Sequence, residues 1–234
     1  RRVRVTTHSR RLSRTTRRRR ATTRTGCLLG RLAAGAWGLA AAASKRPLAS
    51  EALRQGHIAE QRARPVVHFV LRKVHEELVR QGRAADAELL ANATPVVEDG
   101  MRQSSLSAFA SASLDGVLTV AGRPTFWENK AMCADDTLAE STALAKSFGR
   151  FAVLRLTWPP SADDLKRARA IFGSRREDLT QMIHHAAVSR YEGIYSQVNP
   201  KLGAFVRIVH FSIDDEWARR HLCSLHQTMT LHAQ

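Results

Sequence analysis

Three residues in the middle of the chain have the side-chain types that phosphate-ester chemistry needs: Asp115, Glu128 and Lys130. A β-forming run at 117–120 follows Asp115, and a turn is expected at 122–124, where glycine, arginine and proline follow one another. A second β-forming run begins at Phe126 and carries Glu128 and Lys130. The segment 113–132 is therefore predicted to be a β-hairpin.

The hairpin is expected to bring the three polar groups together. Successive side chains of a strand point to opposite faces, so Glu128 and Lys130 face the same side, and the hairpin returns Asp115 beside them. Carboxylate oxygens suit Mg²⁺ or Mn²⁺, and such an ion can generate hydroxide from water and stabilise a phosphoryl transition state. The lysine can position or deprotonate the attacking water, or stabilise the same charge. The alternative is a solvated ion pair without chemistry.

The charge is concentrated at one end of the chain. The net charge is +16, and residues 1–50 hold 14 of the 37 basic residues and none of the 21 acidic ones. The rest is nearly neutral, so we expect a basic arm and helix at 1–49 and one globular domain at 50–234. Such an arm suits nucleic acid, because its cations neutralise phosphates. An organelle-targeting peptide is the alternative.

The three cysteines are far apart and form no Cys-x-x-Cys pair, which argues against a disulfide framework or a zinc site. This pattern favours a reducing intracellular compartment: a nucleus, the host cell of a virus or phage, or a mitochondrion if the arm is a transit peptide. The sequence contains no apolar run of about 18 residues, so no membrane span is predicted.

The order of predicted elements defines the fold class. Periodicity and capping residues predict helices at 50–62, 65–82, 135–148, 161–172, 177–190 and 212–225. Strands are predicted at 93–100, within the hairpin, and at 151–158, 191–198 and 205–213. This order indicates an α/β or α+β domain with a mixed central sheet flanked by helices.

Five motifs in this order resemble those of a known family. They are the helix with Gly56 and Glu60, the strand and turn at 95–101, the Asp-Gly element at 112–118, the Glu-x-Lys strand at 126–130 and the helix that starts with Gln181. From residue 50 onward the chain is similar to the phage-lambda-type exonucleases, or YqaJ-like viral recombinase nucleases, of the PD-(D/E)XK superfamily. This resemblance implies a restriction-endonuclease-like core.

The resemblance also assigns roles. It implies that Asp115, Glu128, the backbone carbonyl of Asn129 and Glu60 hold Mg²⁺ or Mn²⁺. Lys130 would be the catalytic lysine, and Gln181 would orient Lys130 or the water. A loose echo of the family's 5′-phosphate site in the arm implies DNA contacts from three residues: Arg20, Arg24 and Thr25.

The implied activity is 5′→3′ digestion of duplex DNA from its ends in recombination or repair, with DNA, a single-strand annealing protein and further copies of the chain as partners. Leu114 replaces the family's usual proline, the interval from Asp115 to Glu128 is longer than usual, and 131–176 carries an insertion. Two alternatives therefore stay open: a degenerate nuclease fold that only binds nucleic acid, and a non-enzymatic subunit of a mitochondrial ribosome or respiratory complex.

Overall fold

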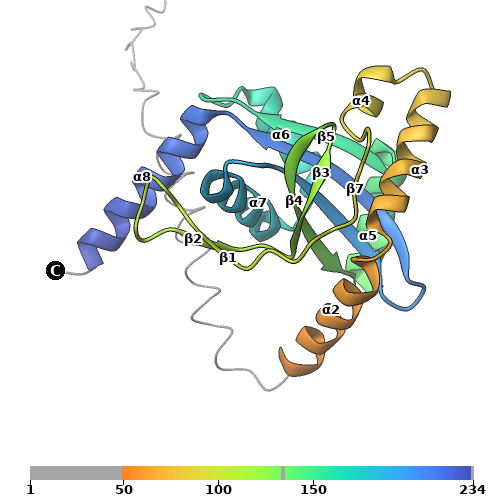
Figure 1. The fold of residues 1–234 in the computed structure, drawn as a ribbon, viewed down its shortest axis with the longest axis horizontal. Coiled ribbons are helices and arrows are strands. Elements are labelled where there is room, and N and C mark those ends of the chain that lie inside the picture. The colour runs from red at the N-terminus through yellow and green to blue at the C-terminus, as the bar shows by residue number, and fades with distance from the viewer. Residues whose placement is uncertain (1–48, 133–134, 233–234) are drawn as a thin grey trace, which may run out of the picture.

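A mixed five-stranded β-sheet with helices on its faces forms the body of the protein in the computed structural model, which describes residues 49–132 and 135–232 (Figure 1). The described helices are α2 (Ala49–Ala63), α3 (Val67–Arg80), α4 (Ala84–Glu88), α5 (Asp135–Phe148), α6 (Ala162–Phe172), α7 (Arg176–Ser189) and α8 (Asp215–His232). The strands are β1 (Met101–Gln103), β2 (Ser111–Ser113), β3 (Gly116–Val120), β4 (Arg123–Ala131), β5 (Phe151–Leu156), β6 (Glu192–Asn199) and β7 (Ala204–Ile213). The expected α/β class is confirmed.

The sheet has the strand order β3-β4-β6-β7-β5, and β1 and β2 pair separately as a small hairpin. Neighbours β3–β4 and β6–β7 are antiparallel, whereas β4–β6 and β5–β7 are parallel. The predicted insertion at 131–176 contains α5, β5 and α6, and β5 forms one edge of the sheet. The strand that carries Glu128 and Lys130 therefore lies inside the sheet, between two partners.

Two hydrophobic cores cover the two faces of the sheet. On one face, β4 places Trp127 in a core with side chains of α2, α3 and α4, such as Leu71. On the other face, β4 places Phe126 in a core with side chains of α6, α7 and α8, such as Met182. Both strand residues are fully buried, because successive side chains of an inner strand enter opposite cores. Trp127 and Glu128 therefore face opposite sides of the sheet, and Glu128 and Lys130 share one face, as the alternation predicted.

The hairpin turn lies one to two residues earlier than predicted. Ala121 and Gly122 are the two residues between β3 and β4, with φ angles of 50° and 74°. Two left-handed residues match the twist of the flanking strands, so the turn is complete at Gly122. Arg123 and Pro124 instead belong to β4. Proline is tolerated there because the pairing of β4 with β6 starts only at Thr125.

The predicted strand at 93–100 was wrong. This segment forms only one isolated bridge, between Val97 and Val117, beside β3. Pro95 lacks a backbone N–H, which interrupts any regular ladder along this edge.

The helix predictions were close. Ser161 and Asp164 form a reciprocal capping box at the start of α6, as their sequence pattern predicted. Helix α8 runs to His232, beyond the predicted end at Leu225, because the sequence after Leu225 contains neither glycine nor proline. Within 49–132 and 135–232, every helix is too short or too polar to cross a lipid bilayer.

Candidate active site

Strand β4 places the Glu-x-Lys pair on the face of the sheet that α7 covers. The side chain of Glu128 is 2% exposed and that of Lys130 is 24% exposed. The ammonium Nζ of Lys130 donates to Oε1 of Glu128 at 2.6 Å. A buried, charge-assisted hydrogen bond of this length restrains both side chains, so they do not behave as a solvated surface pair.

Asp115 lies directly before β3 and reaches the same place. The antiparallel register pairs Gly116 with Trp127, so the next pair outward is Asp115 with Glu128. Oδ2 of Asp115 accepts a hydrogen bond from the backbone N–H of Asn129 at 2.8 Å. The structure therefore brings Asp115, Glu128 and Lys130 together, as the alternation of the strands predicted.

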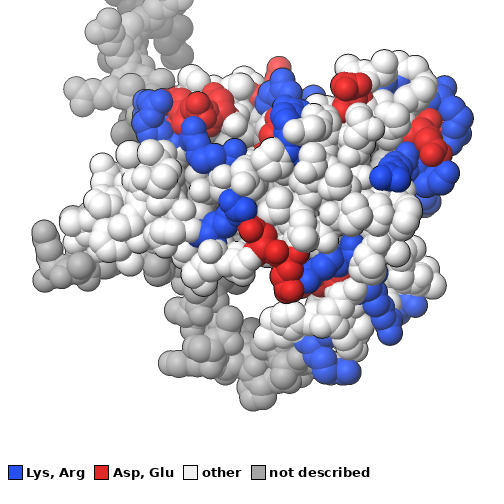
Figure 2. Space-filling view, in the orientation of Figure 1, with Lys and Arg blue, Asp and Glu red and all other residues white. Residues whose placement is uncertain are grey.

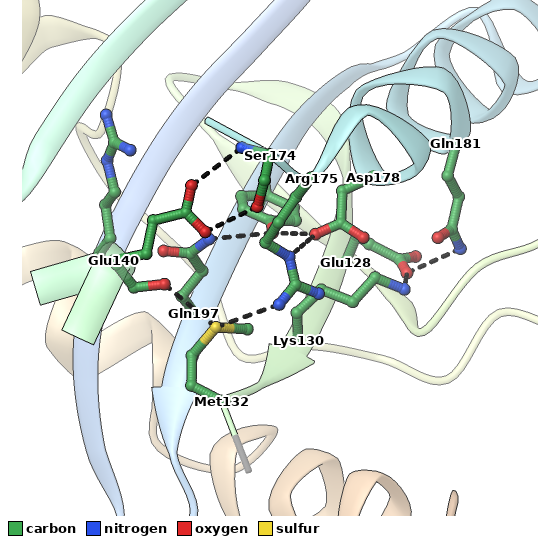
Figure 3. Close-up of polar contacts among 12 residues, drawn as sticks. Glu128, Lys130, Met132, Glu140, Ser174, Arg175, Asp178, Gln181 and Gln197 are labelled. Atoms are coloured by element: carbon green, nitrogen blue, oxygen red, sulfur yellow. Dashed lines mark hydrogen bonds and ion pairs between the residues drawn. The ribbon is translucent and has the colours of Figure 1, made fainter. Parts of the chain in front are cut away.

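Helix α7 completes the surroundings of Glu128. Gln181 donates from Nε2 to Oε1 of Glu128 at 2.7 Å (Figure 3). Nδ1 of His185 lies 3.3 Å from Oε2 of Glu128, which is within ion-pair distance. Oε1 thus accepts two hydrogen bonds, whereas Oε2 accepts none and lies only within ion-pair distance of His185.

A second buried carboxylate, that of Asp178, lies close enough to Lys130 to act on its charge. It accepts hydrogen bonds from Nε of Arg175 and from the hydroxyl of Tyr195. In Figure 3 it lies between Arg175 and the Glu128–Lys130 pair. Asp178 and His185 did not appear among the sequence-based candidates. The signal was their spacing from Gln181, three residues before it and four after it, which places all three side chains on one face of a helix.

The protonation states follow from these contacts. Burial, followed by repulsion from Glu128, raises the pKa of Asp115 from 3.8 to about 7. Burial also acts to raise the pKa of Glu128, but His185 and Lys130 outweigh it, so this pKa is lowered. Burial acts to lower the pKa of Lys130, but Glu128 and Asp178 outweigh it, so this pKa is raised. The lysine is therefore an ammonium at neutral pH, and Asp115 carries the least compensated charge.

Glu60 lies at the margin of this cluster and is held by another residue. Its carboxylate accepts a hydrogen bond from Arg64, the first residue after α2. Arg64 also donates to the backbone carbonyl of Asp115 at 3.1 Å and lies 3.3 Å from Glu98. Glu60 contributes to the raised pKa of Asp115, so the two carboxylates are near each other. In this arrangement the charge of Glu60 is neutralised by Arg64.

The two carboxylates of Asp115 and Glu128 offer oxygen ligands of the kind that divalent cations prefer. Within the described ranges, His, Cys, Asp and Glu side chains nowhere form a group of three or more that could hold a metal ion. However, Oε2 of Glu128 is buried without a hydrogen bond, and Asp115 beside it has a strongly raised pKa. Two neighbouring carboxylates, one buried and one partly buried, fit a divalent cation, because the cation would remove the cost of their charges.

The other predicted site residues have different outcomes. Asn129 uses its backbone N–H for Asp115, and its side chain points away from the cluster and accepts from Ser196. Arg20, Arg24 and Thr25 lie outside the described residues.

The surface of the described domain is a mosaic of both charges. On the face shown in Figure 2, acidic and basic side chains lie side by side in short clusters. This agrees with the near-neutral balance of the chain after residue 50. The excess positive charge of the chain therefore lies in the sequence before residue 50 rather than on this face.

The arrangement can bind a cation with two carboxylates and present a fixed ammonium beside it. Comparisons with protein-family models, with curated proteins and with solved structures found no match for this chain.

Proposed function

We propose that this protein is a metal-dependent DNA nuclease with a restriction-endonuclease-like core. The observation that carries this proposal is the convergence of Asp115, Glu128 and Lys130 in one partly buried cluster. An accessory subunit with an incidental Glu-x-Lys pair would not need this convergence, nor a glutamine on the same carboxylate. The basic sequence before residue 50 supports nucleic acid as the substrate.

Asp115 and Glu128 would hold Mg²⁺ or Mn²⁺, with Glu60 and the carbonyl of Asn129 as further oxygen donors. When bound, the ion would neutralise charge on the scissile phosphate and make water a better nucleophile. Glu128 offers Oε2 for this purpose because Lys130 and Gln181 already occupy Oε1. Glu60 would have to exchange its contact with Arg64 before it could join.

Lys130 would act as a fixed positive charge. Because Glu128 and Asp178 keep its pKa raised, the amine has no free lone pair with which to take a proton from water. Its role would be to orient the attacking water and to stabilise negative charge that develops on the phosphate. Gln181 would keep the Glu128 carboxylate in place while Lys130 acts.

The deciding experiment is incubation of the full chain with end-labelled linear duplex DNA, with Mg²⁺ or with EDTA. We expect cleavage with Mg²⁺ only, and loss of about 10²–10³-fold in rate for Lys130→Ala. Lys166→Ala, which removes an exposed lysine of α6, is the matched control and should keep the full rate. Labels at the 5′ end or at the 3′ end of a strand show the polarity of digestion. A closed circular duplex shows whether cleavage requires a DNA end.

One observation favours a second candidate, a fold that binds nucleic acid without cutting it: Glu60 is neutralised by Arg64. That protein would bind duplex DNA equally well in EDTA and would show no Mg²⁺-stimulated cleavage. Full cleavage by Lys130→Ala would instead show that the active site has been placed wrongly.

A further inference from the structure

A cavity of about 320 Å³ lies at the end of the sheet where β4 ends. It is lined by side chains of α5, by the turn between β6 and β7, and by the first residues of β7. In Figure 1 the tip of β4, α5 and the β6–β7 turn lie at this same end of the sheet. We call this space the α5 cavity.

The α5 cavity is close to the active site. Met132 lies two residues after Lys130, and its Sδ accepts a hydrogen bond from the hydroxyl of Ser141 in α5 at 3.2 Å. Asn199, which lines the cavity, lies two residues after Gln197, and Gln197 pairs with Lys130 across β6 and β4. The regular spacing of a sheet therefore places the backbone of Asn199 about 8 Å from that of Lys130. A DNA strand carries one phosphate per about 3.4 Å of helix axis, so a strand bound at Lys130 would reach the cavity within a few nucleotides.

The polar groups of the α5 cavity are suited to an anion. Lys146 and Arg150 are exposed and line it, and among the described residues no acidic side chain does. Neither cation forms an ion pair within 49–132 and 135–232. Asn199 is buried, and its Oδ1 already accepts the backbone N–H groups of Lys201 and Leu202, at 3.0 and 3.3 Å. Its Nδ2 is therefore the group left for a ligand, and it is a donor, like the two cations.

The remaining wall of the α5 cavity is apolar. It is formed by side chains without a polar group: Leu138, Ala145, Ala204, Phe205 and Val206. Leu202 also lines the cavity and is 76% exposed. Ligand sites commonly combine such a wall with a few polar groups that fix the orientation of the ligand. The α5 cavity therefore suits a ligand that joins an anionic group to an apolar or aromatic body.

We propose that the α5 cavity binds a phosphate group of nucleic acid, with the attached sugar and base against its apolar wall. Lys146 and Arg150 would neutralise the phosphate, and the amide of Asn199 would donate to it. The phosphate belongs either to the backbone of the bound DNA or to a mononucleotide that digestion releases. This inference rests on the proposed function, because it takes nucleic acid as the ligand.

The position of the α5 cavity favours nucleic acid over an acidic protein segment. A carboxylate of a partner protein would meet the same cations, but DNA bound at Lys130 already passes this end of the sheet. The residues from Leu138 to Arg150 belong to the predicted insertion at 131–176. The insertion would thus add a second hold on the substrate beside the active site.

The test measures how salt weakens the binding of DNA to the full chain. A fluorescent duplex oligonucleotide is titrated in EDTA, so that it stays intact, and fluorescence anisotropy gives the binding constant at several salt concentrations. Each phosphate that a cation neutralises contributes about 0.9 to the slope of log K against log salt concentration. Lys146→Gln and Arg150→Gln should therefore each lower the magnitude of this slope by about 0.9.

A matched control separates a local contact from a change in net charge. Lys73→Gln removes the same charge from an exposed lysine of α3, which covers the opposite face of the sheet. It should leave the slope unchanged. A deoxynucleoside 5′-monophosphate then identifies the source of the phosphate. If the mononucleotide lowers the wild-type slope to that of Lys146→Gln, the cavity holds the released product, and if the slope stays the same, the cavity holds the DNA backbone.

Three results would overturn the inference: no binding of DNA at all, equal slopes for the wild type, Lys146→Gln and Lys73→Gln, or binding of polyglutamate that requires Lys146 while the DNA slope does not. The last result would make the cavity a site for an acidic protein.

The two proposals fail separately. Mg²⁺-dependent cleavage by a protein whose slope ignores Lys146 would refute the α5 cavity as a phosphate site and leave the nuclease intact. A slope that depends on Lys146 without any cleavage would refute only the nuclease activity.

Discussion

The two faces of β4 show how one strand serves stability and chemistry at once. On the α3 face, Trp127 is fully buried among hydrophobic side chains, and its indole N–H is satisfied by Ser196 at 3.0 Å. On the α7 face, the next residue, Glu128, is also buried, but its neighbours are the ammonium of Lys130 and the ring of His185. Burial of Trp127 on the first face stabilises the fold. That stability offsets the cost of burying the charged groups on the second face.

The largest effect is expected on the hydrophobic face. Trp127→Ala should lower the free energy of unfolding by about 3–5 kcal/mol, because it leaves a large cavity in the buried α3-side core. Chemical denaturation followed by circular dichroism measures this change. Trp158→Ala, at a partly buried position outside the α3-side core, is the control and should cost less. Equal losses would mean that the α3-side core does not support β4.

Stabilisation by Mg²⁺ should depend only on residues of the polar face. At a Mg²⁺ concentration of about 100 times Kd, the wild-type protein should gain about 2.7 kcal/mol of stability, because the ion binds the folded state alone. Asp115→Asn and Glu128→Gln should remove this gain, while Trp127→Phe should keep it. A rise in melting temperature with Mg²⁺ in Asp115→Asn equal to that of the wild type would contradict the proposed ligands.

The raised pKa of Asp115 predicts how pH affects the metal-free protein. In the unfolded chain this carboxyl loses its proton near pH 3.8, but in the folded protein only near pH 7. Between these values the folded state binds more protons, so stability falls as pH rises, and the full cost is present above pH 7. Since Asp115 is partly exposed, we expect a cost of about 1–2 kcal/mol.

Asp115→Asn should remove that cost while keeping an oxygen that can accept from the backbone N–H of Asn129. In EDTA, the variant should therefore gain about 1–2 kcal/mol over the wild type at pH 8 and almost nothing at pH 4. Urea unfolding at the two pH values measures the difference. A gain of the same size at both would mean that the Asp115 charge is not the cause.

The smallest effect is expected from a substitution in α7, the helix that covers the polar face. Gln181→Ala removes one of the two donors on Oε1 of Glu128, while Lys130 retains the other. We expect the cleavage rate to fall by about fivefold to tenfold, or about 1 kcal/mol, with little change in melting temperature. Gln227→Ala, at an exposed position of α8, provides a control outside α7. A loss as large as that of Lys130→Ala would give Gln181 a direct catalytic role.

The sequence was informative wherever a rule depends on near neighbours. Alternation along 126–130 predicted that Glu128 and Lys130 would face the same side, and the capping pattern at Ser161 predicted the start of α6. The same local rules located the hairpin but misplaced its turn, because glycine and proline both predict turns and only the pairing with β6 shows where Pro124 is tolerated. The prediction at 93–100 failed because Pro95 cannot donate to a ladder, so the segment pairs with β3 only at Val97.

The sequence by itself determined the alternation of β4, the bounds of most helices and the candidate triad of Asp115, Glu128 and Lys130. Only the tertiary structure decided that Asp178 and His185 face this triad, that Arg64 neutralises Glu60 and that β5 forms the edge of the sheet. The physical reason is the range of the interactions. Strand alternation and helix capping act over a few residues, whereas the contact between Gln181 and Glu128 joins residues 53 apart, which only the packing of α7 on the sheet brings together.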